Sequence, residues 1–148
     1  MKPAPFDYVA PRSLDEAVAA LAEGGPEAKL LAGGQSLIPL LNFRLARPAL
    51  LVDLNRVAEL AYVRPRNRGT AIGAMTRQMT IERDRALSEK QPLLAEAIRW
   101  VGHVAIRSRG TIGGSLAHAD PAAELSIGAP CAARGSEPRR RAGLRQAA

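Results

Sequence analysis

Two pairs of adjacent glycines constrain the fold of this chain most, because glycine allows positive φ angles and close backbone contacts that other residues exclude. The first pair, Gly33-Gly34, follows a short apolar run and stands in the sequence AGGQS. The second pair, Gly113-Gly114, lies about eighty residues later in the sequence TIGGS. Either pair alone is typical of an ordinary turn. Together they predict two loops that converge on one elongated ligand.

The first part of the chain has the pattern of a small parallel βαβ unit. Ser13 and Glu16 match a capping box, which predicts a helix from Ser13 to about Gly25. Apolar runs at residues 28–31 and 50–54 predict two buried strands, with a short helix between them. Since a strand, a crossover and a second strand favour parallel pairing, we expect residues 1–55 to form one lobe.

From residue 56 the pattern becomes mixed α/β. Apolar residues 60–63 and 70–72 flank a polar stretch and predict a hairpin. Thr80 is expected to cap a short helix, and Pro92 opens a clearer one that ends near Gly102, with Trp100 in the core. We expect residues 56–130, with a last helical turn at 122–125, to form a second, incomplete lobe.

The last residues carry a basic charge that the rest of the chain lacks. The net charge is +7, of which residues 131–148, with five arginines and one glutamate, supply 5 − 1 = +4. Two interpretations stay open: a disordered basic tail, or a sequence translated out of the original frame. A nucleic-acid-binding protein driven by this tail is an alternative function. Because the other residues carry only a modest charge, nucleic acid is not the expected partner.

Composition excludes several other classes. No apolar run approaches the roughly 20 residues that cross a bilayer, and the N-terminus lacks a secretory signal, so we expect a cytoplasmic protein without a transmembrane segment. One cysteine, Cys131, and two unrelated histidines, His103 and His118, provide no plausible metal site. We expect no metal ligand and no catalytic acid or base in this chain.

The glycine pairs suit a diphosphate, because its oxygens accept hydrogen bonds from backbone N–H groups that glycine leaves accessible. Ser36, Thr111 and Ser115 add hydroxyl groups beside them. Neither sequence is a phosphate-binding P-loop, since no Gly-Lys-Ser/Thr follows. Neither is the G-x-G-x-x-G fingerprint of the usual NAD-binding fold.

Three stretches carry a resemblance to a known family: PxxFDYxxPxSLDEAVxxL, AGGQSLIPLLNFRLARP and RxxGTIGGSLAHADPAAEL. They resemble the FAD-binding subunit of molybdenum hydroxylases, the group of aerobic carbon monoxide dehydrogenase and xanthine dehydrogenase. The resemblance implies an α+β, two-lobed fold of the vanillyl-alcohol-oxidase type, with FAD held noncovalently between the lobes. It implies that the diphosphate is bound by Ala32, Gly33, Gly34, Gln35, Ser36, Thr111, Ile112, Gly113, Gly114 and Ser115. Lys29 would lie near the adenine half and Asp120 near the ribityl chain.

The resemblance also implies partners and a role. A molybdopterin-containing large subunit oxidises the substrate, a 2Fe–2S small subunit relays electrons, and FAD passes them to NAD, a quinone or another acceptor. Members of this family continue beyond Pro130, so we expect a truncated chain with weak or absent FAD binding. Another flavoenzyme of the same fold, such as a UDP-N-acetylenolpyruvoylglucosamine reductase, is an alternative, but its catalytic residues are not found.

Overall fold

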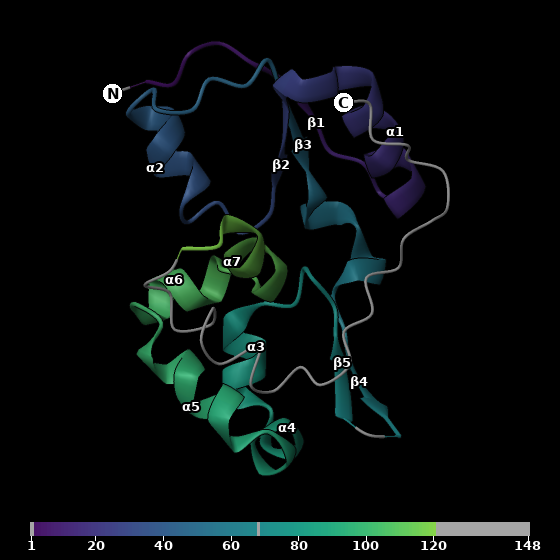
Figure 1. Ribbon diagram of the computed structural model, residues 1–148, viewed down its shortest axis with the longest axis vertical. Helices are drawn as coiled ribbons and strands as arrows, with labels where there is room; N and C mark the ends of the chain where they lie inside the picture. The colour runs from purple at the N-terminus through teal and green to yellow at the C-terminus, as the bar shows by residue number, and fades with distance from the viewer. Residues whose placement is uncertain (1, 68, 121–148) are drawn as a thin grey trace.

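The computed structural model describes residues 2–67 and 69–120 (Figure 1). The expected basic tail at 131–148 and the expected helical turn at 122–125 lie outside the described residues. In chain order the elements are β1 Asp7–Val9, α1 Leu14–Gly24, β2 Ala28–Leu31, α2 Leu37–Asn42, β3 Leu50–Asp53, β4 Val63–Arg66, β5 Gly69–Ile72, α3 Gln78–Arg83, α4 Arg85–Lys90, α5 Pro92–Trp100, α6 Val104–Arg109 and α7 Ile112–His118.

The N-terminal part is a three-stranded parallel sheet in the order β1-β3-β2. Leu51 in the central strand pairs with Tyr8 on one side and Lys29 on the other. Helices α1 and α2 lie on opposite sides of this sheet (Figure 1). The expected parallel pairing of β2 with β3 is confirmed. Strand β1 was not expected, because its three residues are all exposed and show no alternation.

Helix α1 forms where its capping residues predict it. The Ser13 hydroxyl accepts a hydrogen bond from the Glu16 N–H at 3.2 Å, and the Glu16 carboxylate accepts one from the Arg12 N–H at 2.8 Å. Ala17 on the inner face of the helix packs with Val52 and Val57 in a small apolar core. This core fixes α1 against one face of the sheet.

The second part begins with the antiparallel hairpin β4-β5. The hairpin was expected, but its strands continue to Arg66 and Gly69, so that most of the expected polar loop is strand. Helices α3, α4 and α5 follow, and they surround a second apolar core. It consists of the buried residues Ile81, Leu87, Leu94 and Ile98.

Two expectations for these helices are wrong. Thr80 does not cap a helix, because α3 already begins at Gln78, and Asp84 instead caps α4 by accepting a hydrogen bond from the Leu87 N–H at 2.9 Å. Trp100 ends α5 and is 72% exposed rather than buried. It lies two residues after the buried Ile98, about 200° further around the helix, and therefore on the outer face.

Candidate cofactor-binding site

The two glycine segments lie in direct contact. We call residues 32–36 the first glycine segment and residues 111–115 the second. A Cβ atom built on Gly33 would lie 2.5 Å from the Arg109 carbonyl oxygen, and one built on Gly114 would lie 3.2 Å from the Cβ of Ala32. In Figure 1, α7 lies next to the connection between β2 and α2. The proximity of the two segments expected from the sequence is therefore present.

The first glycine segment connects the end of β2 to the start of α2. Gly34 has φ +76, which glycine adopts without strain, and its carbonyl accepts the first hydrogen bond of the next helix, from Ile38. Within the described residues, the N–H groups of Gly33, Gly34, Gln35 and Ser36 have no protein acceptor. Four successive donors are thus available to a ligand.

A cavity of about 420 Å³ adjoins these donors. It lies beyond the carboxyl ends of β2 and β3, where ligands bind in open parallel sheets. The first turn of α2 and the end of α6 complete its wall. The lining residues are Leu31, Ala32, Gly33, Gly34, Gln35, Ile38, Pro39, Asp53, Asn55 and Arg109.

The second glycine segment has a different geometry from the open loop that was expected. It forms the start of α7, and the N–H groups of residues 112–115 already have acceptors: Gly113 donates to the Ala74 carbonyl at 2.8 Å and Gly114 to the Thr111 hydroxyl at 3.1 Å. Thr111 is 2% exposed. Ile112 donates to Thr76, and Ser115 donates to Thr111. This segment packs behind the first one and does not line the cavity.

The two outlying candidates lie outside the cavity wall. Lys29 is exposed in the middle of β2, two residues before Leu31, and therefore on the same face of the sheet as that cavity-lining residue. Asp120 is exposed and follows α7, whose last residue is His118. The structure thus places the second glycine segment against the first, with Lys29 in the strand before it, while Asp120 follows α7.

Sequence reasoning missed the polar residues that surround the first glycine segment. Asn55 donates from Nδ2 to the Ala32 carbonyl at 3.0 Å, and its Oδ1 accepts from the Arg77 guanidinium at 2.6 Å. The other end of that guanidinium donates to the Arg109 carbonyl. The position of Asn55 just after β3 was the available signal, since side chains there reach the carboxyl edge of a sheet. For Arg77 the sequence held no such signal.

Asp53 at the end of β3 is held by several donors. Tyr8 donates its hydroxyl to Oδ2 at 2.5 Å, and Asn55 donates its N–H to Oδ1 at 2.8 Å. Partial burial would raise the pKa of Asp53, but these hydrogen bonds and the nearby Arg56 outweigh it and hold the pKa below its ordinary value. Asp53 is therefore ionised at neutral pH and organises its neighbours.

The guanidinium of Arg77 lies near that of Arg109. Burial, followed by repulsion from Arg109, lowers the pKa of Arg77, while Asp53 acts in the opposite direction. The guanidinium remains charged, because its ordinary pKa is far above neutrality. Two guanidinium groups near one cavity favour an anionic ligand, which relieves their repulsion.

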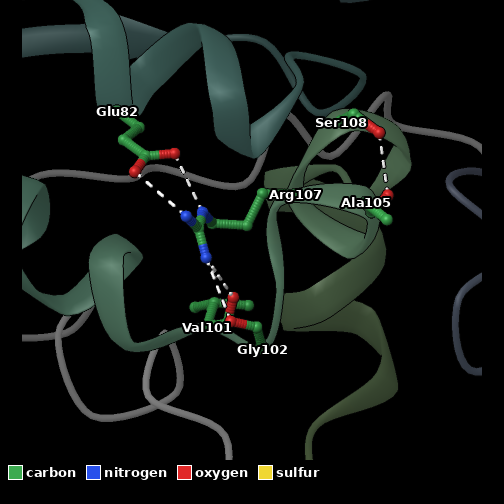
Figure 2. Close-up of polar contacts among 6 residues, drawn as sticks. All are labelled: Glu82, Val101, Gly102, Ala105, Arg107 and Ser108. Atoms are coloured by element: carbon green, nitrogen blue, oxygen red, sulfur yellow. Dashed lines mark hydrogen bonds and ion pairs between the residues drawn. The ribbon is translucent and has the colours of Figure 1, made fainter.

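A partly buried ion pair supports the backbone that leads to the second glycine segment (Figure 2). Arg107 in α6 is 8% exposed and pairs with Glu82 of α3 at 2.8 Å. Its remaining donors reach the carbonyls of Val101 and Gly102, which connect α5 to α6. The pair fixes α6, and with it the backbone that leads through Arg109 to Thr111.

Within the part of the chain that the structure describes, no three His, Cys, Asp or Glu side chains gather in a group able to hold a metal ion. His103 precedes α6 and His118 ends α7, and both are exposed. Within the described ranges, residues 2–67 and 69–120, no helix has both the length and the apolar character needed to cross a membrane.

Comparison with known proteins gives the same assignment for most of the chain. Residues 4–136 match the family described as the FAD binding domain in molybdopterin dehydrogenase. The chain is 55% identical over 127 residues to the 6-hydroxypseudooxynicotine dehydrogenase complex subunit alpha of Paenarthrobacter nicotinovorans, covering 86% of this chain and 43% of the relative. It is 45% identical to the carbon monoxide dehydrogenase medium chain of Hydrogenophaga pseudoflava, covering 82% of this chain and 42% of the relative.

Solved structures agree with these matches. A chain of the reconstituted CO dehydrogenase from Oligotropha carboxidovorans superimposes with a TM-score of 0.82 at 41% identity, covering 84% of this chain and 44% of that one. The two-lobed FAD-binding fold expected from the sequence is confirmed. The chain spans less than half the length of the curated relatives it matches.

Proposed function

Because the chain belongs to the family of FAD-binding domains in molybdopterin dehydrogenases, we propose that its first glycine segment holds the diphosphate of FAD. One observation carries this proposal: the four N–H groups of residues 33–36 have no acceptor in the described chain, and three of these residues, Gly33, Gly34 and Gln35, line the cavity. The fit is chemical as well as spatial, since a diphosphate accepts several hydrogen bonds at once. Arg77 and Arg109 add positive charge nearby.

The residues differ in how they contribute. Residues 32–36 would contact the diphosphate directly through backbone donors and the Ser36 hydroxyl. Residues 111–115 would act chiefly by holding the first segment in place, since the N–H groups of residues 112–115 are already bonded. The Ser115 hydroxyl would be a further donor. The proposed cofactor-binding set is Lys29, Ala32, Gly33, Gly34, Gln35, Ser36, Thr111, Ile112, Gly113, Gly114, Ser115 and Asp120.

The proposed role is that of the electron-transfer subunit. FAD, when bound, supplies the redox chemistry, and the residues of this chain bind and orient it. By the family resemblance, a 2Fe–2S subunit would deliver electrons that come from a molybdopterin-containing large subunit, and NAD, a quinone or another acceptor would receive them. Two relatives are named as a subunit of a complex and as a medium chain, which supports such an assembly.

Substrate choice belongs elsewhere in that assembly. Relatives that share this domain are named for different substrates, among them 6-hydroxypseudooxynicotine and carbon monoxide. A cradle made of backbone donors distinguishes diphosphates from other ligands but not one oxidised substrate from another. We therefore assign the choice of substrate to the molybdenum-containing subunit.

Competition for FAD tests the proposal. The 148-residue chain is equilibrated with FAD in a dialysis cell, ADP, AMP or riboflavin is added as competitor, and the FAD that stays bound is quantified by chromatography. ADP carries the diphosphate without the flavin, so it is expected to displace FAD at lower concentration than AMP or riboflavin. Displacement by riboflavin at the same concentration as ADP would contradict a site built around the diphosphate.

A further inference from the structure

Arg77 connects two parts of the chain that both border the cavity. Its side chain donates to Oδ1 of Asn55, which follows β3, at 2.6 Å. The same guanidinium donates to the carbonyl of Arg109, the last residue of α6. The two acceptors are 22 and 32 residues away along the chain, so Arg77 joins elements that are not neighbours in sequence.

Asn55 extends this connection to the first glycine segment. Its Nδ2 group donates to the Ala32 carbonyl at 3.0 Å and to Oδ1 of Asp53 at 2.5 Å. A continuous path of hydrogen bonds therefore runs from Ala32 through Asn55 and Arg77 to Arg109. The path closes on itself, because Gly33 packs directly against the Arg109 carbonyl.

We propose that Arg77 is a positioning residue: together with Asn55 it forms a clasp that fixes the first glycine segment against Arg109 and so sets the geometry of the diphosphate cradle. This inference rests on the proposed function and names a residue that determines how well the cradle binds. Four backbone N–H groups can all donate to one diphosphate only if the first glycine segment is held in a fixed conformation.

The positioning role of Arg77 depends on the two separate donor groups of its guanidinium and not on its charge alone. Its two terminal nitrogens each have a protein acceptor on a different part of the chain. Lysine carries the same charge on a single nitrogen at the end of a flexible stem, and so it does not hold two acceptors in a fixed geometry. A residue acting only through its charge would be replaced by lysine without loss.

The test uses the full 148-residue chain with four variants: Arg77→Lys, Arg77→Gln, Asn55→Ala and the double variant Arg77→Lys with Asn55→Ala. Arg83→Gln is the matched control, because Arg83 is exposed at the other end of α3. The dissociation constant for FAD is measured at a temperature where each variant has the circular dichroism spectrum of the wild type. A purely structural defect would lower the unfolding midpoint without changing this constant.

The clasp predicts that each single variant weakens FAD binding by about tenfold to a hundredfold, while the control does not. The double variant is expected to bind no more weakly than the weaker single variant, since both changes open the same clasp. Wild-type affinity in Arg77→Lys, or losses that simply add in the double variant, would overturn the proposal.

A second measurement separates this inference from the proposed function. If the wild-type chain bound no FAD, the proposed function would fail, and the clasp would then be tested in the ligand-free chain by amide hydrogen exchange. Arg77→Gln is expected to speed exchange at the N–H groups of Asn55 and Ile112, which bond to Asp53 and Thr76. Unchanged exchange at both positions would overturn the clasp whether or not FAD binds.

Discussion

The two glycine segments share a short sequence pattern but have opposite relations to the ligand site. In the first, which follows β2, the N–H groups of residues 33–36 have no acceptor within the described chain, and Gly33, Gly34 and Gln35 line the cavity. In the second, which begins α7, Gly113 and Gly114 donate to Ala74 and Thr111. The N–H donors of the first segment are available to a ligand, whereas those of Gly113 and Gly114 are already bonded to the protein.

The difference shows that glycine serves two physical purposes here. In the first segment it provides the positive φ of Gly34 and leaves donors free. In the second it provides room, because a Cβ on Gly113 would lie 2.6 Å from the Cβ of Ala74. We infer that the first segment binds and the second supports, and the following predictions test that division from the largest effect to the smallest.

The largest effect is expected behind the second segment, at the ion pair that fixes α6. Arg107→Met leaves Glu82 and the carbonyls of Val101 and Gly102 without their donor. Because these three acceptors lose the buried guanidinium that donates to them, we expect a loss of about 3 kcal/mol in the free energy of unfolding, measured by urea denaturation. Arg99→Met, at an exposed position in α5, is the control. Equal stability of the two variants would contradict a supporting role for this pair.

A methyl group in the second segment is expected to act on stability more than on binding. Gly113→Ala places a Cβ too close to Ala74, so α7 must shift, and the free energy of unfolding should fall by about 2 kcal/mol. The affinity of the folded fraction for ADP, measured by calorimetry, should change less than in the Gly34 variant described next. A variant that kept its stability and lost ADP binding would reverse the roles assigned to the two segments.

The same change in the first segment is expected to act on binding. Gly34→Ala forces a side chain into φ +76, which costs about 1 kcal/mol, and displaces the unbonded donors, so ADP affinity should fall by about tenfold. The control is Gly25→Ala, also at positive φ but with no atom within 4 Å of the new Cβ and away from the cavity. Equal loss of ADP affinity in both variants would show that strain alone is responsible.

The smallest effect concerns acid stability at the edge of the cavity. The folded-state pKa of Asp53 lies below its ordinary value of 3.8, so its carboxylate stabilises the fold above that value and the contribution is lost as pH falls through the folded-state pKa. Unfolding curves are recorded at neutral pH and at about pH 3. The acid-induced loss of stability should be smaller for Asp53→Asn, by less than about 1 kcal/mol because the carboxylate is only partly buried and solvent screens its interactions. An identical loss in both proteins would contradict a stabilising Asp53 network.

Local sequence signals predicted the elements that position the site. The capping box at Ser13, the apolar runs of β2 and β3, and the glycines after β2 each act within a few residues, so their effects can be seen in the sequence. The convergence of the two glycine segments was also anticipated, from the needs of one extended ligand.

The features that were missed depend on contacts between distant residues. Arg77 meets Asn55 and Arg109, and Arg107 meets Glu82, across 22 to 32 residues of chain that no local pattern describes. The helical start at Thr111 was missed for a related reason: its buried hydroxyl and the Ala74 carbonyl decide that the amides there are bonded, and only the fold brings Ala74 near.

The most direct test follows each glycine amide separately during binding. The ¹⁵N-labelled chain is titrated with ADP, and the backbone N–H resonances are monitored by NMR, a readout that tolerates weak affinity. The account predicts large, saturable shifts at Gly33, Gly34, Gln35 and Ser36, with much smaller shifts at Gly113 and Gly114. Shifts concentrated at Gly113 and Gly114, or none at residues 33–36 at saturating ADP, would contradict it.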